Sequence, residues 1–173
     1  WQSVLRAIES DPHSVNDIST ATSPTHGGSL ALDEKVALPA YSDKMDVHLM
    51  PGNYQGGHSQ GAEAGVVYDN GLDVFSFGVM GKNLDDIGHS MANFTRLKWP
   101  DLNPKLIVDV GCTIGHNTLP WKQTFPEAEV RGLDAASPCL QYGHARAEAM
   151  GIPIQFKQAL CDALPYSDRC VDV

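Results

Sequence analysis

Hydrophobic and polar positions alternate in blocks along the last third of the chain. A short apolar run occupies residues 106–108, two further short segments that suit strands occupy residues 130–134 and 154–159, and polar turns and helix-length segments separate the three. Short apolar runs that alternate with helix-length segments are typical of βαβ units, whose strands pair in parallel. The pattern therefore predicts an α/β fold, with a parallel sheet in residues 105–173.

Residues 1–104 show a different pattern, which predicts a mostly helical, loop-rich extension. Apolar residues have helical spacing in residues 1–10, and a loop rich in Ser, Thr, Asp, Pro and Gly is predicted for residues 11–28. Residues 62–68 are predicted to be helical, and Asp-Asn-Gly at 69–71 is a turn signal.

A second helix is predicted shortly before the first apolar run, with Asn83 as its cap. Its apolar residues fall on one helical face, which is expected to be buried: Leu84, Ile87, Met91, Phe94 and Leu97. Other segments are less regular. Residues 30–38 suit a short helix or an extended arm, residues 74–80 suit a helix or a strand, and the glycines in residues 41–61 favour a shaped loop.

Composition narrows the class of ligand. The chain has 21 acidic and 12 basic residues, which gives a net charge of −9 at pH 7. Nucleic-acid binding normally needs a basic face, so this balance favours a small-molecule ligand. No apolar run approaches the roughly 20 residues that span a bilayer, so no membrane partner is expected. The four cysteines form no Cys-x-x-Cys pair, which argues against zinc. Cysteines in the predicted cofactor half fit a reducing, cytoplasmic setting best.

The most informative stretch follows the first apolar run. Asp109 leads into a turn that contains Gly111, Cys112 and Gly115, and a predicted helix follows. Small residues let a ligand approach the backbone closely, and the amides and dipole at the start of a helix favour an anionic group. This layout predicts a nucleotide-cofactor loop. Cys112 is expected to be a small residue that fits the turn, and not a nucleophile.

Two further acids follow at distances that suit a nucleotide. Asp134 ends the second predicted strand, and a carboxylate about 20 residues after a glycine turn commonly holds ribose hydroxyls. Asp162 lies in the polar turn after the third run, where its carboxylate is placed to accept from an adenine amino group.

Taken together, these residues resemble the class I S-adenosylmethionine-dependent methyltransferases. The family's first motif is an acid followed by three glycines at alternate positions, and here Thr113 replaces the middle glycine. The resemblance covers residues 105–173 and implies a partial Rossmann-like fold that binds S-adenosylmethionine. It assigns the methionine end of the cofactor to Asp109, the ribose to Asp134 and the adenine edge to Asp162. The full set of cofactor-binding residues that it implies is Asp109, Gly111, Cys112, Gly115, Asp134, Ala135, Asp162 and Ala163.

The implied function is methyl transfer to a small-molecule acceptor, and two alternatives stay open. A non-catalytic module would bind the cofactor and transfer nothing. An NAD(P)-dependent oxidoreductase needs Gly-x-Gly-x-x-Gly, but positions 113 and 116 hold Thr and His, which counts against it.

The sequence identifies no catalytic residue, because methyl transfer mainly requires alignment of the acceptor and exclusion of water. His48, His58 and Tyr54 lie in the glycine-rich loop and are candidates to line the pocket, but their spacing matches no metal site. His116 follows the glycine turn, where it is expected to contact the cofactor or to cap the helix.

The resemblance also predicts that the chain is a piece of a longer enzyme. It implies a seven-stranded sheet, in which residues 170–173 open a fourth strand beside the first, and position 1 is Trp1 and not methionine. A sheet edge left uncovered there would favour self-association.

Overall fold

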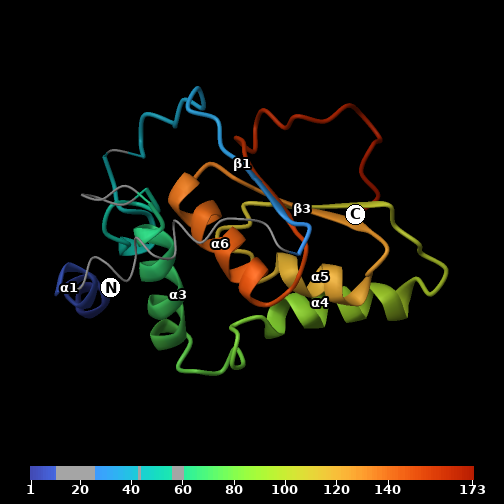
Figure 1. The fold of residues 1–173 in the computed structure, drawn as a ribbon, viewed down its shortest axis with the longest axis horizontal. Helices are drawn as coiled ribbons and strands as arrows, with labels where there is room; N and C mark the ends of the chain where they lie inside the picture. The colour runs from blue at the N-terminus through green and yellow to red at the C-terminus, as the bar shows by residue number, and fades with distance from the viewer. Residues whose placement is uncertain (11–25, 43, 56–60) are drawn as a thin grey trace.

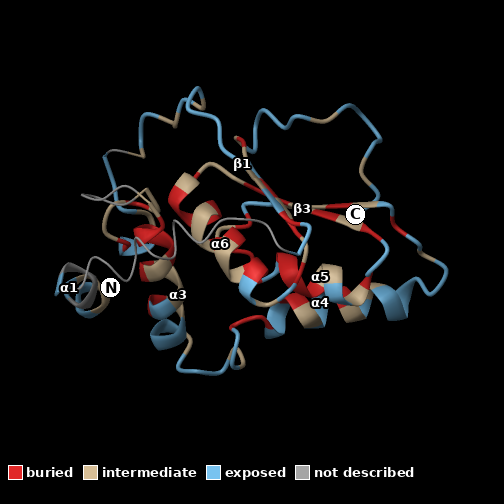
Figure 2. Cartoon of the chain, viewed as in Figure 1, coloured by how far each residue is buried: buried red, intermediate tan, exposed pale blue. Residues whose placement is uncertain are grey.

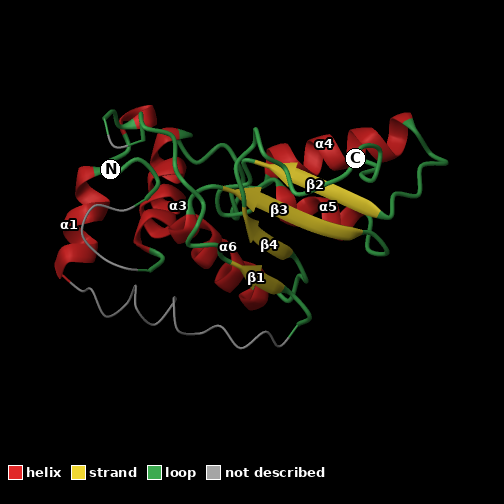
Figure 3. Cartoon of the chain, turned by 90° about the horizontal axis from the view of Figure 1, so that it is seen from above, coloured by secondary structure: helices red, strands yellow, loops and turns green. Residues whose placement is uncertain are grey.

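The computed structural model describes residues 1–10, 26–42, 44–55 and 61–173, and its centre is a four-stranded parallel sheet in the order β1-β4-β3-β2. The strands are β1 (Ser29–Ala31), β2 (Leu106–Val110), β3 (Glu129–Asp134) and β4 (Gln155–Gln158). The crossover helices are α5 (Thr118–Thr124) and α6 (Ser137–Ala149). The predicted α/β class and Rossmann-like parallel sheet are therefore confirmed (Figures 1 and 3).

The main core lies between the sheet and the crossover helices. Both crossovers run in the same direction across the sheet, and right-handed crossovers then place α5 and α6 on one face. Figure 1 shows the two helices on the same side of the strands, and Figure 2 shows buried residues between them and the sheet. The strands contribute Ile107, Val130 and Phe156 to this core, and the helices contribute Leu119, Leu140 and Ala147.

Helix α4 (Asp86–Lys98) packs on α5 through small residues and not through the predicted apolar face. Its buried residues are Gly88 and Ala92, and a Cβ atom on Gly88 would lie 2.8 Å from the Cα atom of Asn117. Leu84 is buried but lies before the helix, and the other four apolar side chains of the predicted face are 49% to 78% exposed: Ile87, Met91, Phe94 and Leu97. The prediction of a buried apolar face was wrong, because the backbones approach so closely that only small residues fit. The predicted cap at Asn83 was also wrong, since the capping position is Asp85.

Helix α3 (Glu63–Phe75) continues through the turn that was predicted at residues 69–71. Asn70 donates from Nδ2 to the carbonyl of Val66, one turn back along the helix. Gly71 lies against the indole ring of Trp1, which a Cβ atom at this position would overlap. The turn prediction was wrong, because residues 69–71 stay helical. Gly71 serves instead as the point where Trp1, just before α1 (Gln2–Ser10), packs closely on the helix.

The N-terminal segment shares a core with the sheet domain. Helix α3 packs against α6 so closely that a Cβ atom on Gly65 would overlap the Cβ atom of Tyr142. A second buried cluster spans this contact and consists of Met50, Ala64, Val67, Ile114, Ala136 and Cys139. The division of the chain into two domains between residues 104 and 105 stays a prediction.

The N-terminal segment also supplies a strand and a short 3-10 helix, η1 (Val47–Leu49). Within residues 30–38, the extended alternative was closer to the structure, because residues 29–31 form β1 and pair with β4. Residues 74–80 hold only the end of α3 and the turns after it. Their apolar side chains are exposed rather than part of a further element: Val74, Phe75, Phe77 and Val79. The loop predicted at residues 11–28 lies mostly outside the described residues.

Asp172 and Val173 pair with the free edge of β2, where the opening of a further strand was predicted, although no strand is assigned to them. Val108 donates to the carbonyl of Val173 (2.9 Å), and Val173 donates to the carbonyl of Leu106 (3.4 Å), which is a parallel pattern. The Asp172 carboxylate also accepts from the amide of Leu106 (2.9 Å). Self-association through a sheet edge stays a prediction. Within the described residues, no helix has both the length and the apolar character needed to cross a bilayer.

Candidate cofactor site

The glycine turn joins the end of β2 to α5 and has three residues in the left-handed region: Gly111 (φ 79°), Thr113 (φ 48°) and Gly115 (φ 83°). An added Cβ atom on Gly111 would meet nothing within 4 Å, so a ligand can approach the backbone there. On Gly115 it would lie 2.8 Å from Leu119 Cδ1, so this glycine allows the turn to pack on α5. Left-handed backbone is strained for a β-branched residue such as Thr113, and such strain is typical of functional turns.

Asp134 holds the glycine turn and the start of α6 together. Its Oδ2 atom accepts from the amide of Thr113 (2.8 Å), and its Oδ1 atom accepts from the amide of Ala136 (2.8 Å). Burial raises the pKa of this carboxyl group, although the two amides oppose the shift. Each carboxylate oxygen keeps further acceptor capacity, which suits a pair of ligand hydroxyl groups.

Asp109 is a second, mostly buried acid at the same end of the sheet. It accepts a hydrogen bond from the Thr118 hydroxyl group at its Oδ2 atom (2.6 Å). Burial raises the pKa of Asp109, the Thr118 hydrogen bond lowers it, and the charge of Asp134 raises it further. Two acids that interact in this way create a negative potential, which favours cationic groups and hydroxyl donors.

Cys112 lies inside the turn and is buried. Its Sγ atom is so close to β3 that a Cβ atom on Gly132 would lie 2.9 Å from it. Burial raises the pKa of the thiol well above its ordinary value, and the charges of Asp134 and Asp109 add to this. A thiol that resists ionisation is a poor nucleophile, which supports the interpretation of Cys112 as a small packing residue.

The residues predicted to hold adenine are less enclosed. Asp162 and Ala163 are exposed in the turn after β4, and Ala135 is half-buried after β3. The ends of these strands are tied together, because Gln158 donates from Nε2 to the Ala135 carbonyl (2.9 Å) and Ala159 donates to the Asp134 carbonyl (3.0 Å). The structure thus groups Asp109, Asp134 and the glycine turn, and it leaves Asp162 at the rim.

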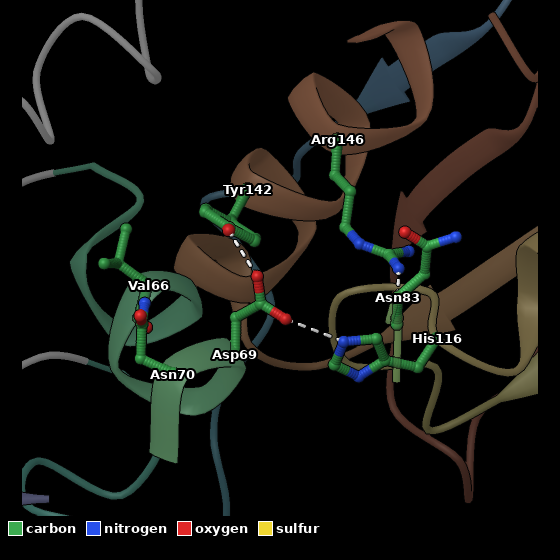
Figure 4. A network of polar contacts seen from close by, with 7 residues as sticks. All are labelled: Val66, Asp69, Asn70, Asn83, His116, Tyr142 and Arg146. Carbon is green, nitrogen blue, oxygen red and sulfur yellow. Dashed lines mark hydrogen bonds and ion pairs between the residues drawn. The ribbon is translucent and has the colours of Figure 1, made fainter. Parts of the chain in front are cut away.

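His116 is held by residues that the sequence did not suggest. Its Nε2 atom lies 2.8 Å from Asp69 Oδ1, and the Tyr142 hydroxyl group donates to Asp69 Oδ2 (2.6 Å) (Figure 4). Burial alone would raise the pKa of Asp69, but the hydrogen bonds from His116 and Tyr142 and the charge of Arg146 lower it overall. His116 therefore anchors the glycine turn to α3 and α6.

Aromatic side chains from the N-terminal segment lie close to His116, which follows the glycine turn. Tyr54 and Tyr68 have ring centroids 5.5 Å apart, and the Tyr68 ring lies 6.0 Å from that of His116. His48 Nδ1 lies 2.6 Å from the Tyr54 hydroxyl group. His48 and Tyr54 were predicted as pocket-lining residues, whereas Tyr68 was not, because nothing in its local sequence links it to residues in the glycine turn. His58 lies outside the described residues.

Among the described residues, no three His, Cys, Asp or Glu side chains are grouped so that they could hold a metal ion.

A parallel sheet with a glycine turn after its first crossover strand and an acid at the end of the next strand is typical of α/β domains that bind nucleotide cofactors. Residues 107–173 also match the family described as a methyltransferase domain. This match supports the resemblance of residues 107–173 to the class I S-adenosylmethionine-dependent methyltransferases.

Two curated relatives agree with this assignment. The chain is 39% identical over 69 residues to the demethylmenaquinone methyltransferase of Thermus thermophilus. The aligned residues make up 40% of this chain and 31% of the relative. The chain is also 34% identical over 73 residues to the malonyl-[acyl-carrier protein] O-methyltransferase of Xylella fastidiosa. Here the aligned residues make up 42% of this chain and 24% of the relative. The match thus spans less than a third of the length of either relative.

Proposed function

We propose that this chain contains the cofactor-binding part of an enzyme that transfers a methyl group from S-adenosylmethionine to a small-molecule acceptor. The observation that carries the proposal is the hydrogen bond from the Thr113 amide to Asp134, which joins the glycine turn to the acid at the end of the next strand. A single ligand could then lie close to the backbone of the glycine turn and also donate hydrogen bonds to the Asp134 carboxylate.

The donor set fits the proposed cofactor. Asp134 is proposed to accept from the two ribose hydroxyl groups, and Asp109 is proposed to provide a negative charge near the methionine ammonium group. The open space over Gly111 admits the ligand to the backbone. Ala135, Ala163 and Asp162 are proposed to contact the adenine.

S-adenosylmethionine supplies an activated methyl group on a sulfonium ion, and the transfer is an in-line displacement. The residues of this chain bind the cofactor, fix its orientation and limit the access of water. No general base is assigned, because an acceptor that carries no proton of high pKa needs none. A cytoplasmic location is part of the proposal, and it is supported by four cysteines that are all free thiols.

The acceptor is proposed to bind on the side of His48 and Tyr54. The names of the two relatives give different acceptors, demethylmenaquinone and malonyl-[acyl-carrier protein], so neither is carried over to this chain. The net charge of −9 supports a small-molecule acceptor over a nucleic acid.

Equilibrium dialysis of the whole chain with methyl-labelled S-adenosylmethionine tests the cofactor. We expect saturable binding that S-adenosylhomocysteine displaces and NAD does not. Gly111→Val should weaken binding, because its side chain would enter the open approach. Gly78→Val is the matched control, since Gly78 also has a positive φ (69°) and open space around it, but lies in the turn after α3. Binding of NAD with no displacement by S-adenosylhomocysteine would contradict the proposal.

A further inference from the structure

Two tyrosine rings from the N-terminal segment lie beside the glycine turn. Tyr54 and Tyr68 have centroids 5.5 Å apart and ring planes tilted by 51°. The two rings therefore do not stack flat, and their faces are inclined to each other. His48 contacts the Tyr54 ring edge-on (84°), and His116 contacts the Tyr68 ring (34°). Histidine rings thus support this tyrosine pair on both sides.

Hydrogen bonds fix both rings in place. The Tyr54 hydroxyl group lies 2.6 Å from His48 Nδ1. Burial raises the pKa of Tyr68, and a hydrogen bond with the Thr113 side chain partly offsets this. The contact with His48 holds the Tyr54 ring at its hydroxyl end, and the Tyr68 ring lies between those of Tyr54 and His116.

Several contacts place the pair at the mouth of the cofactor site. Cys139, in the first turn of α6, contacts the Tyr54 carbonyl at 3.7 Å. Both rings pack on the cluster that contains Ile114 of the glycine turn and Ala136, which follows Asp134 by two residues. Tyr54 and Tyr68 therefore bridge the glycine turn and the strand end that carries the ribose acid.

The chemistry of the proposed cofactor puts its charge at the same place. The sulfonium sulfur is bonded to the carbon that leads to the ribose and to the chain that leads to the methionine ammonium group. With the ribose at Asp134 and the methionine end at the glycine turn, the sulfonium group lies between them. A cation within about 6 Å of an aromatic face is attracted by the ring quadrupole, and paired rings form cages for such cations.

We propose that Tyr54 and Tyr68 form an aromatic cage that binds the sulfonium group and distinguishes charged S-adenosylmethionine from neutral S-adenosylhomocysteine. This inference rests on the proposed function and adds a residue pair that recognises charge. Its consequence is that the product, which has lost the positive charge, binds less favourably to the cage and leaves more readily.

Calorimetric titration of the full chain with both ligands tests the cage. Tyr68→Leu and Tyr54→Leu should each weaken S-adenosylmethionine binding about three- to tenfold relative to S-adenosylhomocysteine binding. Tyr68→Phe, which keeps the ring, should leave the ratio of the two affinities within about twofold. Tyr41→Leu is the control, since Tyr41 is 58% exposed and outside the ring pair.

The ratio is measured within each variant, so S-adenosylhomocysteine binding also reports whether the variant is folded. If a leucine variant fails to fold, fluorinated phenylalanines at position 68 provide a shape-preserving series, and the ratio should fall as fluorination weakens the ring quadrupole. An unchanged ratio in variants that still bind S-adenosylhomocysteine would overturn the cage and leave the proposed function intact. Failure of the wild-type chain to bind either ligand would overturn both.

Discussion

The two sides of the candidate site are held together in different ways. On the sheet side, Asp134 fixes the glycine turn through backbone amides, and the partners come from neighbouring strands. On the other side, Asp69 and the two tyrosines are held through side-chain contacts, and the partners of Asp69, His116 and Tyr142, lie 47 and 73 residues away in the sequence. The sheet side, which is held through backbone amides, suits recognition of the cofactor, whose structure does not vary. The other side, which is held through side chains, can change by single substitutions. We therefore expect specificity for the acceptor to depend on that side.

Gly65→Ala should have the largest effect on this arrangement, because it forces α3 away from α6. A Cβ atom there would overlap that of Tyr142, so we expect the free energy of unfolding to fall by about 2–3 kcal/mol. At an ordinary helical site the same change would raise stability by about 1 kcal/mol. Urea denaturation of the wild type, of this variant and of Asp73→Ala, an exposed control on the same helix, measures the difference. An increase in stability would mean that the two sides are not packed as described.

Asp69→Asn should have an intermediate effect that depends on pH. The variant loses a charged acceptor of two hydrogen bonds, so the expected loss at pH 7 is about 1–3 kcal/mol. The pKa of Asp69 is lowered by folding. The stability that its charge contributes is therefore fully present above pH 3.8, its ordinary pKa, and is lost as the pH falls further.

Urea denaturation at pH 7 and at pH 3 checks this sign, with Asp73→Asn as the matched control on the exposed face of α3. The gap between the wild type and Asp69→Asn should narrow at pH 3. A gap of the same size at both pH values would show that the charge of Asp69 is not what stabilises the contact.

Phe94→Ser should have the smallest effect, because this side chain on α4 is 61% exposed. We expect a change of less than about 0.5 kcal/mol in the free energy of unfolding. Phe125→Ser, at a position next to α5 that is 8% exposed, should cost about 3–5 kcal/mol. Thermal unfolding followed by circular dichroism compares the pair. A comparable loss for both variants would indicate that the apolar face of α4 is buried after all.

Local patterns were enough to predict the sheet side of the site. The apolar runs gave β2, β3 and β4 nearly within their bounds, because each strand, its turn and its acid are contiguous in the sequence. The same contiguity located Asp109 and Asp134 at one end of the sheet. Whether these residues bind the cofactor in the predicted roles stays a prediction.

Long-range contacts explain what sequence patterns missed. Gly71 has a turn-like neighbourhood, but its packing partner is Trp1, 70 residues away. Tyr68 and Asp69 were missed because their contacts are with His116, next to the glycine turn, and, for Asp69, with Tyr142 of α6. The periodicity of α4 was correct, but periodicity does not tell which face another helix will cover. Strand β1 has only three residues, too few for an alternating pattern to be recognised.

The central claim is that Asp134 binds the ribose while it holds the glycine turn. Titration of S-adenosylhomocysteine into the wild type and Asp134→Asn tests it most directly, with the exposed Asp168→Asn as control. Each charge-assisted hydrogen bond to a hydroxyl group contributes roughly 1.5–3 kcal/mol, so the account predicts at least about tenfold weaker binding for Asp134→Asn. It predicts no change for Asp168→Asn. A folded Asp134→Asn variant with the wild-type dissociation constant would contradict the account.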